Sequence, residues 1–182
     1  IDLSAVISGP MATQILADQG ADVIKVEGPG PGDIVRYLGP TKNGVNAMFT
    51  AVNRNKRGIV LNLKSPEGRQ VLLDLVKTAD VIVENFRPGA LERLGLGYPQ
   101  LKAVNDGLIY ASMSGFGDHG PYAKRRVYDP VIQATSGFSD TQANAATGEP
   151  QLIQTLACDK TMAITAAQAI TAALYAKARG RG

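Results

Sequence analysis

Strand and helix patterns alternate along most of this chain, with short connections between them. Four short apolar runs predict strands: Asp22–Glu27, Gly58–Leu63, Asp80–Val83 and Leu108–Met113. Ile1–Ser4 reads as the end of a further strand that runs into a turn. Alternation of this kind favours a parallel sheet with helices on both faces, because parallel strands need crossover connections. The fold class that we predict is therefore α/β.

Helix signals fill the spaces between the strands. Gly9-Pro10 opens a helix that Gly20 ends, and Ser65-Pro66 supplies an N-cap followed by proline at the first helical position. Three later segments are also predicted to be helical: Tyr98–Val104, Asp129–Phe138 and Lys160–Ala178. Residues 139–154 read as a loop.

Composition limits the classes of partner. With 182 residues and a net charge of +3, the chain fits about one domain and lacks the basic excess typical of nucleic-acid binding. Its longest uncharged run, 161–176, contains Thr and Gln and falls short of the roughly 20 apolar residues of a membrane span. One cysteine cannot form an internal disulfide, which favours a cytoplasmic location.

The two ends of the chain resemble cut ends. No residues precede Ile1 to complete its strand, and the Ala-rich helix stops in Gly180-Arg181-Gly182. We therefore expect an N-terminal piece of a longer protein. Residues 1–158 would form one domain, and residues 159–182 would lead as a helix toward a second domain that is absent here.

Several catalytic arrangements are disfavoured by residue counts. His119 is the only histidine, and no Gly-x-Ser-x-Gly elbow is present for a hydrolase nucleophile. One His and one Cys cannot form a tetrahedral metal site, so we expect no metal. A dinucleotide fingerprint beginning at Gly28 fails because Asp33 occupies its third glycine position.

Basic and polar residues after the predicted strands are the candidate ligand-binding groups. Basic residues cluster around Arg54–Arg57, at Lys64 and at 124–126, where they form either a solvated face or a phosphate site. Asn85-Phe86 directly follows a strand, the position at which open α/β sheets bind ligands. The alternative is an ordinary turn with a packed Phe.

Asp159 is the most informative carboxylate. It stands just before the predicted final helix, so it is either an N-cap or a nucleophile. The two roles are compatible, because a helix N-terminus favours the ionised carboxylate that nucleophilic attack requires.

Long, ordered stretches of this sequence resemble the class III CoA-transferases, which include formyl-CoA and carnitine-type CoA-transferases and the α-methylacyl-CoA racemases. The resemblance covers essentially the whole chain. It is carried by Gly9-Pro10, Leu16–Glu27, Gly32-Asp33 with Arg36, Asn53–Arg57, Leu61–Lys64, Val83–Gly89, Tyr110 with Ser114–Gly117, and Gly120-Pro121.

The resemblance implies a Rossmann-like N-terminal domain, a smaller second domain and two chains threaded together as an interlocked homodimer. It also implies a reaction in which acyl-CoA and a carboxylic acid are substrates and no cofactor is tightly bound. An Asp carboxylate attacks the acyl-CoA thioester, and CoA passes through a thioester on that carboxylate to the acceptor acid. Asp159 is the matching catalytic residue.

The resemblance further implies which residues contact CoA. Lys64, Arg93 and Arg126 would meet its phosphates, and Leu61 and Phe86 would line its adenine or pantetheine. Val6 with Ile7, and Asn85, complete the implied set.

Two alternatives to a transferase stay open. Racemases of the family place a His where Tyr128 stands here, and a Tyr with a pKa near 10 is a poor base. A racemase would therefore need a different base. The second alternative is a non-catalytic acyl-CoA-binding domain in which Asp159 only caps a helix.

We expect this segment alone to show little activity, because the family's acyl pocket also draws on the second domain and the partner subunit.

Overall fold

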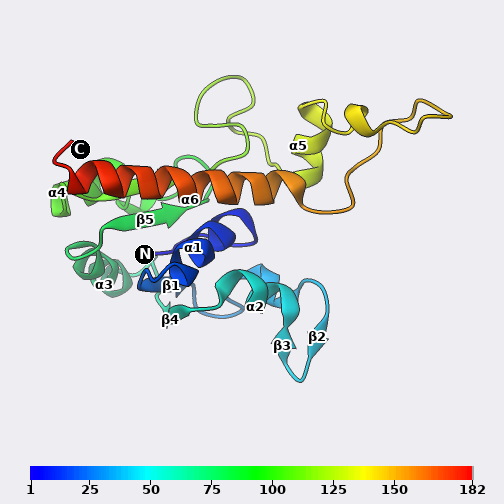
Figure 1. The fold of residues 1–182 in the computed structure, drawn as a ribbon. Coiled ribbons are helices and arrows are strands. Elements are labelled where there is room, and N and C mark those ends of the chain that lie inside the picture. Colours follow the sequence, from blue (N-terminus) through cyan, green and yellow to red (C-terminus); the bar gives the residue numbers. More distant parts are fainter. Residues whose placement is uncertain (182) are drawn as a thin grey trace.

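The computed structural model describes residues 1–181 (Figure 1). Its helices and strands follow in chain order: α1 (Ser8–Asp18), β1 (Val23–Glu27), the 3-10 helix η1 (Ile34–Tyr37), β2 (Thr41–Lys42), β3 (Val45–Asn46), α2 (Ala47–Asn53), β4 (Lys56–Val60), α3 (Pro66–Val76), β5 (Val81–Glu84), η2 (Glu92–Leu94), α4 (Tyr98–Val104), β6 (Ile109–Ser112), α5 (Asp129–Thr135), η3 (Asp140–Gln142) and α6 (Ala157–Ala178).

The first three residues lie in the middle of the main sheet. β1 pairs in parallel with β4, and β5 pairs in parallel with β6. Between these two ladders, Asp2 forms parallel bridges to Lys25 and to Val83. Asp2 N donates to Ile24 O and Leu3 N donates to Val83 O, each at 2.8 Å. The order β4–β1–(Ile1–Leu3)–β5–β6 is that of a doubly wound Rossmann-like sheet, so the predicted fold class is confirmed.

Helices cover both faces of this sheet. On one face Ile82 of β5 packs with Leu72 and Val76 of α3 and Leu101 of α4. The next residue, Val83, points to the other face and packs with apolar residues of α1, of α6 and of the segment after β6, namely Ala12, Ala163, Ile170 and Met113. This alternation follows from the period of two along a strand. Figure 1 shows the long α6 running past β5 and α1.

The predicted helix boundaries have clear local causes. Gly20 has a φ of +100° and ends α1. The Ser65 side chain accepts a hydrogen bond from Gly68 N at 3.1 Å, as an N-cap does. A Cβ on Gly68 would lie 2.1 Å from Asn62 O, so the first turn of α3 requires glycine there.

Some elements differ from the sequence prediction. The predicted strand Gly58–Leu63 is displaced: β4 begins at Lys56 and ends at Val60. Its limits are those of its pairing with β1, which runs from Lys56 to Val60. The β2–β3 hairpin and α2 were not predicted. α5 ends at Thr135, and α6 begins at Ala157 rather than Lys160.

α6 packs on the body formed by the preceding residues. Its Ala163 and Ile170 are at most 3% exposed and share a core with Ala12 and Val83. The domain boundary expected between residues 158 and 159 falls inside this helix. That boundary stays a prediction about the longer protein.

Candidate active site

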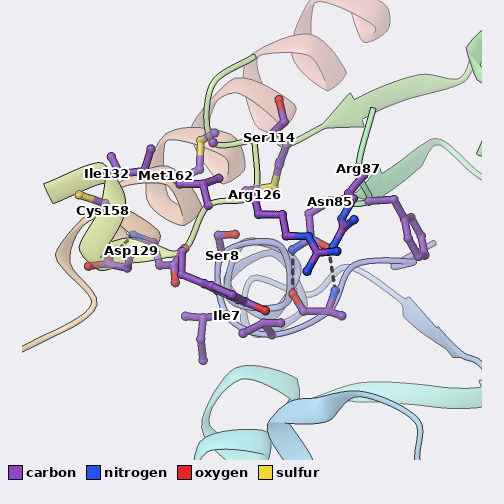
Figure 2. A pocket seen from close by; sticks show the side chains of 18 of the residues that line it. Ile7, Ser8, Asn85, Arg87, Ser114, Arg126, Asp129, Ile132, Cys158 and Met162 are labelled. Carbon is purple, nitrogen blue, oxygen red and sulfur yellow. Dashed lines mark hydrogen bonds between the residues drawn. The ribbon is translucent and has the colours of Figure 1, made fainter. Parts of the chain in front are cut away.

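A pocket of about 430 Å³ opens at the carboxyl ends of the central strands. The turn after Ile1–Leu3 and the turn after β5 form one part of its wall, and the segment after β6, residues 125–128, α5 and α6 supply the rest. Ile1–Leu3 and β5 are the neighbouring strands at which the strand order reverses, where doubly wound sheets bind their ligands. Figure 2 shows Asn85 and Arg87 on one side of the pocket and Ile132 and Cys158 on the other.

Asp159 lines this pocket from the first turn of α6. Burial raises the pKa of its half-buried carboxyl from 3.8 to about 6, and the nearby Asp129 adds to that increase. Asp159 is not the N-cap, which corrects one of its two predicted roles. Leu156 occupies the N-cap position and forms no side-chain cap.

Asp129 performs the capping instead, from a different helix. It lies at the start of α5, is 3% exposed, and accepts a hydrogen bond from Asp159 N through Oδ2 at 2.9 Å. The Asp159 carboxylate is therefore not needed to satisfy the end of its own helix. Asp129 also lines the pocket, and sequence reasoning missed it.

Gln133, one turn along α5, supports Asp129. Its Nε2 donates to Asp129 Oδ1 and also to Thr155 O at 3.2 Å, while its Oε1 accepts from Ile153 N at 2.8 Å. Gln133 is 1% exposed. These contacts fix the chain that enters α6 and hold Asp159 in place. The i,i+4 spacing of Asp129 and Gln133 in a predicted helix was the available sequence signal.

Asn85 holds the turn on the opposite side of the pocket. Its Nδ2 donates to Ala5 O at 2.7 Å, and its Oδ1 accepts from Ala5 N at 2.8 Å (Figure 2). Both ends of the amide are thus engaged with backbone. Asn85 shapes the pocket wall through this clamp.

The predicted CoA contacts divide into two groups. Val6, Ile7, Asn85, Phe86 and Arg126 line the pocket together. Leu61, Lys64 and Arg93 do not line it. Leu61 is 8% exposed in the core beyond β4, whereas Lys64 is exposed in the turn after β4 and Arg93 is exposed in η2.

Three arginines give one wall a positive charge: Arg87, Arg125 and Arg126 line the pocket with exposed side chains. Within residues 1–181, none of these guanidinium groups forms an ion pair with a carboxylate. Arg125 stacks 4.3 Å from the ring centroid of Tyr122. The wall therefore presents free guanidinium groups, which suit phosphate or carboxylate ligands.

His119 and possible metal ligands are the other candidate groups within residues 1–181. The His119 side chain is 92% exposed, lies beside Asp118, and is absent from the pocket lining. Across residues 1–181 no group of three or more His, Cys, Asp or Glu side chains is placed to hold a metal ion. The same residues include no helix with the length and hydropathy of a membrane span.

Sequence comparison relates the whole chain to one family. The model of CoA-transferase family III matches residues 1–182. A succinate–glutarate CoA-transferase of Agrobacterium fabrum is 44% identical over 190 residues, which cover 100% of this chain and 47% of that protein. A formyl-CoA:oxalate CoA-transferase of Rhodopseudomonas palustris is also 44% identical, over 100% of this chain and 43% of the relative.

Structure comparison gives the same result. The crystal structure of a CAIB/BAIF family protein from Brucella suis superposes with a TM-score of 0.91 at 42% identity. It matches 98% of this chain and 48% of the solved chain. The chain spans less than half the length of the curated relatives it matches.

Proposed function

Because this chain belongs to CoA-transferase family III, we propose that it forms the CoA-binding half of an acyl-CoA:carboxylate CoA-transferase whose nucleophile is Asp159. One observation carries the proposal. The pocket at the switch point of the sheet holds a half-buried carboxylate that its own helix does not need as a cap.

The proposed reaction begins with attack by an Asp159 oxygen on the thioester carbonyl carbon. The carbon–sulfur bond breaks, CoA leaves as a thiolate, and a mixed anhydride forms. The thiolate then attacks the aspartyl carbonyl carbon, which releases the donor acid and leaves an aspartyl-CoA thioester. The acceptor carboxylate then attacks this thioester, which releases the CoA thiolate and forms a second mixed anhydride. The thiolate attacks the carbonyl carbon of the acceptor, which gives the new acyl-CoA and regenerates Asp159. Covalent catalysis divides one difficult transfer into easier steps.

The structure supports this chemistry through charge placement. α1 and α6 both begin at the pocket, where Ser8, Cys158 and Asp159 line it. Helix N-termini carry partial positive charge, which favours the negative charge that develops on a thioester oxygen. The guanidinium groups of Arg125 and Arg126 would meet CoA phosphates.

The remaining CoA contacts are proposed at the rim. Phe86 is 39% exposed beside Arg87, so its ring is available to the adenine or pantetheine. Lys64 and Arg93 would bind phosphates where CoA extends along the carboxyl edge of the sheet, and Leu61 would support that edge from the core. Val6 and Asn85 would contact CoA from the pocket wall.

Two further parts of the proposal are an interlocked homodimer in the full-length protein, which the family resemblance implies, and a cytoplasmic location, which the cysteine count favours. The single cysteine, Cys158, agrees with a reducing compartment.

Trapping the covalent intermediate tests the proposed function. The full-length protein is incubated with a panel of acyl-CoAs and free carboxylic acids, quenched with hydroxylamine and mapped by peptide mass spectrometry. We expect a hydroxamate at Asp159 only when acyl-CoA is present. An unmodified Asp159 with α-proton exchange into deuterated solvent would indicate a racemase. CoA binding without either reaction would indicate a binding domain.

The pH dependence of turnover gives a second prediction. Asp159 must be ionised to attack, and its pKa in the ligand-free protein is raised to about 6, so kcat/KM for acyl-CoA should fall as pH decreases through about 6. The limb should have a slope of one. A limb near pH 4, the ordinary value for Asp, would contradict the assignment.

A further inference from the structure

The turn Ser4–Ile7 is tied to the loop after β1 by a buried carboxylate. Asp33 Oδ1 accepts hydrogen bonds from Val6 N and from Val35 N, each at 3.1 Å. Its own backbone N donates to Glu27 Oε1 at 2.8 Å, so the residue is anchored on β1. The Asp33 side chain is 1% exposed. This carboxylate lies outside the pocket lining and takes no part in the proposed reaction.

A buried lysine completes the support. Lys25 Nζ lies 3.1 Å from Asp33 Oδ2 and donates to Ser4 O at 2.9 Å, with its side chain 3% exposed. Asp33 Oδ2 has no hydrogen-bond partner within residues 1–181, so charge attraction to Lys25 holds it. Burying an ion pair carries a desolvation penalty that hydrophobic side chains of similar volume avoid. Stability alone is therefore a poor explanation for the Asp33–Lys25 pair. Its contacts with Val6 N and Ser4 O indicate that it positions the turn.

The turn that these groups hold has a strained backbone. Val6 has a φ of +70°, the left-handed region that β-branched residues rarely adopt. Such a conformation persists only where the surroundings determine it. Here Asp33 binds Val6 N, and Asn85 clamps the neighbouring Ala5 on both sides of its backbone.

The strained turn determines where α1 enters the pocket. Ile7 and Ser8 follow directly and both line the pocket. A Cβ on Gly9 would lie 2.3 Å from Ser4 Cβ, so the first turn of α1 rests closely on the strained segment. A shift of Val6 into an ordinary conformation would move this end of the helix.

We propose that Asp33 and Lys25 are positioning residues for acyl-CoA: their buried pair holds Val6 in its left-handed conformation and thereby fixes the pocket wall that receives CoA. The inference rests on the proposed function for the identity of the ligand. It adds two residues that neither touch the ligand nor enter the chemistry.

A double-substitution experiment on the full-length protein tests this role, with the dissociation constant for CoA measured by calorimetry. Asp33→Ala should weaken CoA binding about tenfold or more, because valine then relaxes out of the left-handed region. In a Val6→Gly background the same Asp33→Ala change should weaken binding by less than about threefold, because glycine adopts positive φ without enforcement. Rescue of this kind separates positioning from a general loss of stability.

Asp74→Ala is the matched control, since Asp74 is an exposed carboxylate that pairs with Lys77 on α3 away from the pocket. It should leave CoA affinity unchanged. If Asp33→Ala does not yield folded protein, Asp33→Leu, which fills the volume and removes both acceptor oxygens, is used in both backgrounds. An equal loss of affinity in the two backgrounds, or no loss in either, overturns the inference. Absence of CoA binding in the unsubstituted protein would instead refute the proposed function, and the inference with it.

Discussion

Asp159→Asn should reduce kcat of the full-length enzyme by a factor of about 10³ or more, because the amide cannot form the covalent intermediate. CoA affinity should stay close to that of the unsubstituted protein, since the arginines of the pocket wall are unchanged. The hydroxylamine-sensitive adduct should disappear. Steady-state kinetics, calorimetry and peptide mapping check these three outcomes.

The same substitution should not reduce the melting temperature. An acid whose folded pKa is about 6 and whose unfolded pKa is 3.8 makes the folded state less stable as pH rises from about 4 to 6. A neutral amide removes that penalty, and Asp129 still caps α6. Asp106→Asn, an exposed aspartate in the turn before β6, is the matched control and should change neither property. A melting temperature several degrees lower for Asp159→Asn would favour a capping role over a catalytic one.

Asp129→Asn should lower both stability and turnover. The carboxylate accepts hydrogen bonds from Asp159 N and from Gln133 Nε2, whereas an amide of the same shape can accept at only one end. Either Asp159 N or Gln133 Nε2 then loses its acceptor on residue 129, at a cost of about 1–3 kcal/mol. The first turn of α6 should shift as a result, and we expect kcat/KM to fall about 10²-fold.

The pH profile of Asp129→Asn tests a separate effect, that of the Asp129 charge on the pKa of Asp159. Removing its negative charge lowers the pKa of Asp159, because that charge is one of the two causes of the raised value. The acid limb of kcat/KM should therefore move to lower pH, while in Asp106→Asn it should stay near 6. An unmoved limb in Asp129→Asn would mean that burial alone sets the pKa of Asp159.

The sequence predicted most helices and strands because local signals determine where they begin and end. Ser65-Pro66 and Gly20 mark helix ends through backbone chemistry that depends on few neighbours. The Ala47–Asn53 helix was missed although Asn46 caps it through Phe49 N, since no long apolar period accompanies so short a segment. The start of β4 was placed two residues late because strand register depends on the partner strand.

The candidate site was predictable only in part. Asp159 and five residues of the pocket wall were assigned from a family resemblance, and the pocket contains them. The spacing of Asp129 and Gln133 indicates only their contact within α5, whereas the capping of α6 by Asp129 depends on the packing of α5 against α6. Lys25 reads as an ordinary polar position in a strand, yet the fold buries it between Asp33 and Asp2.

The placement of Ile1–Leu3 has a consequence for how this sheet assembles. β1 with β4, and β5 with β6, are each joined through a nearby helix-containing connection, so each ladder has moderate sequence separation. The central segment must then insert between them and pair on both sides, with β5 about eighty residues away. Until it docks, β1 and β5 both present unpaired inner edges, the kind of surface on which other chains add strands. Docking of this central segment therefore competes kinetically with aggregation.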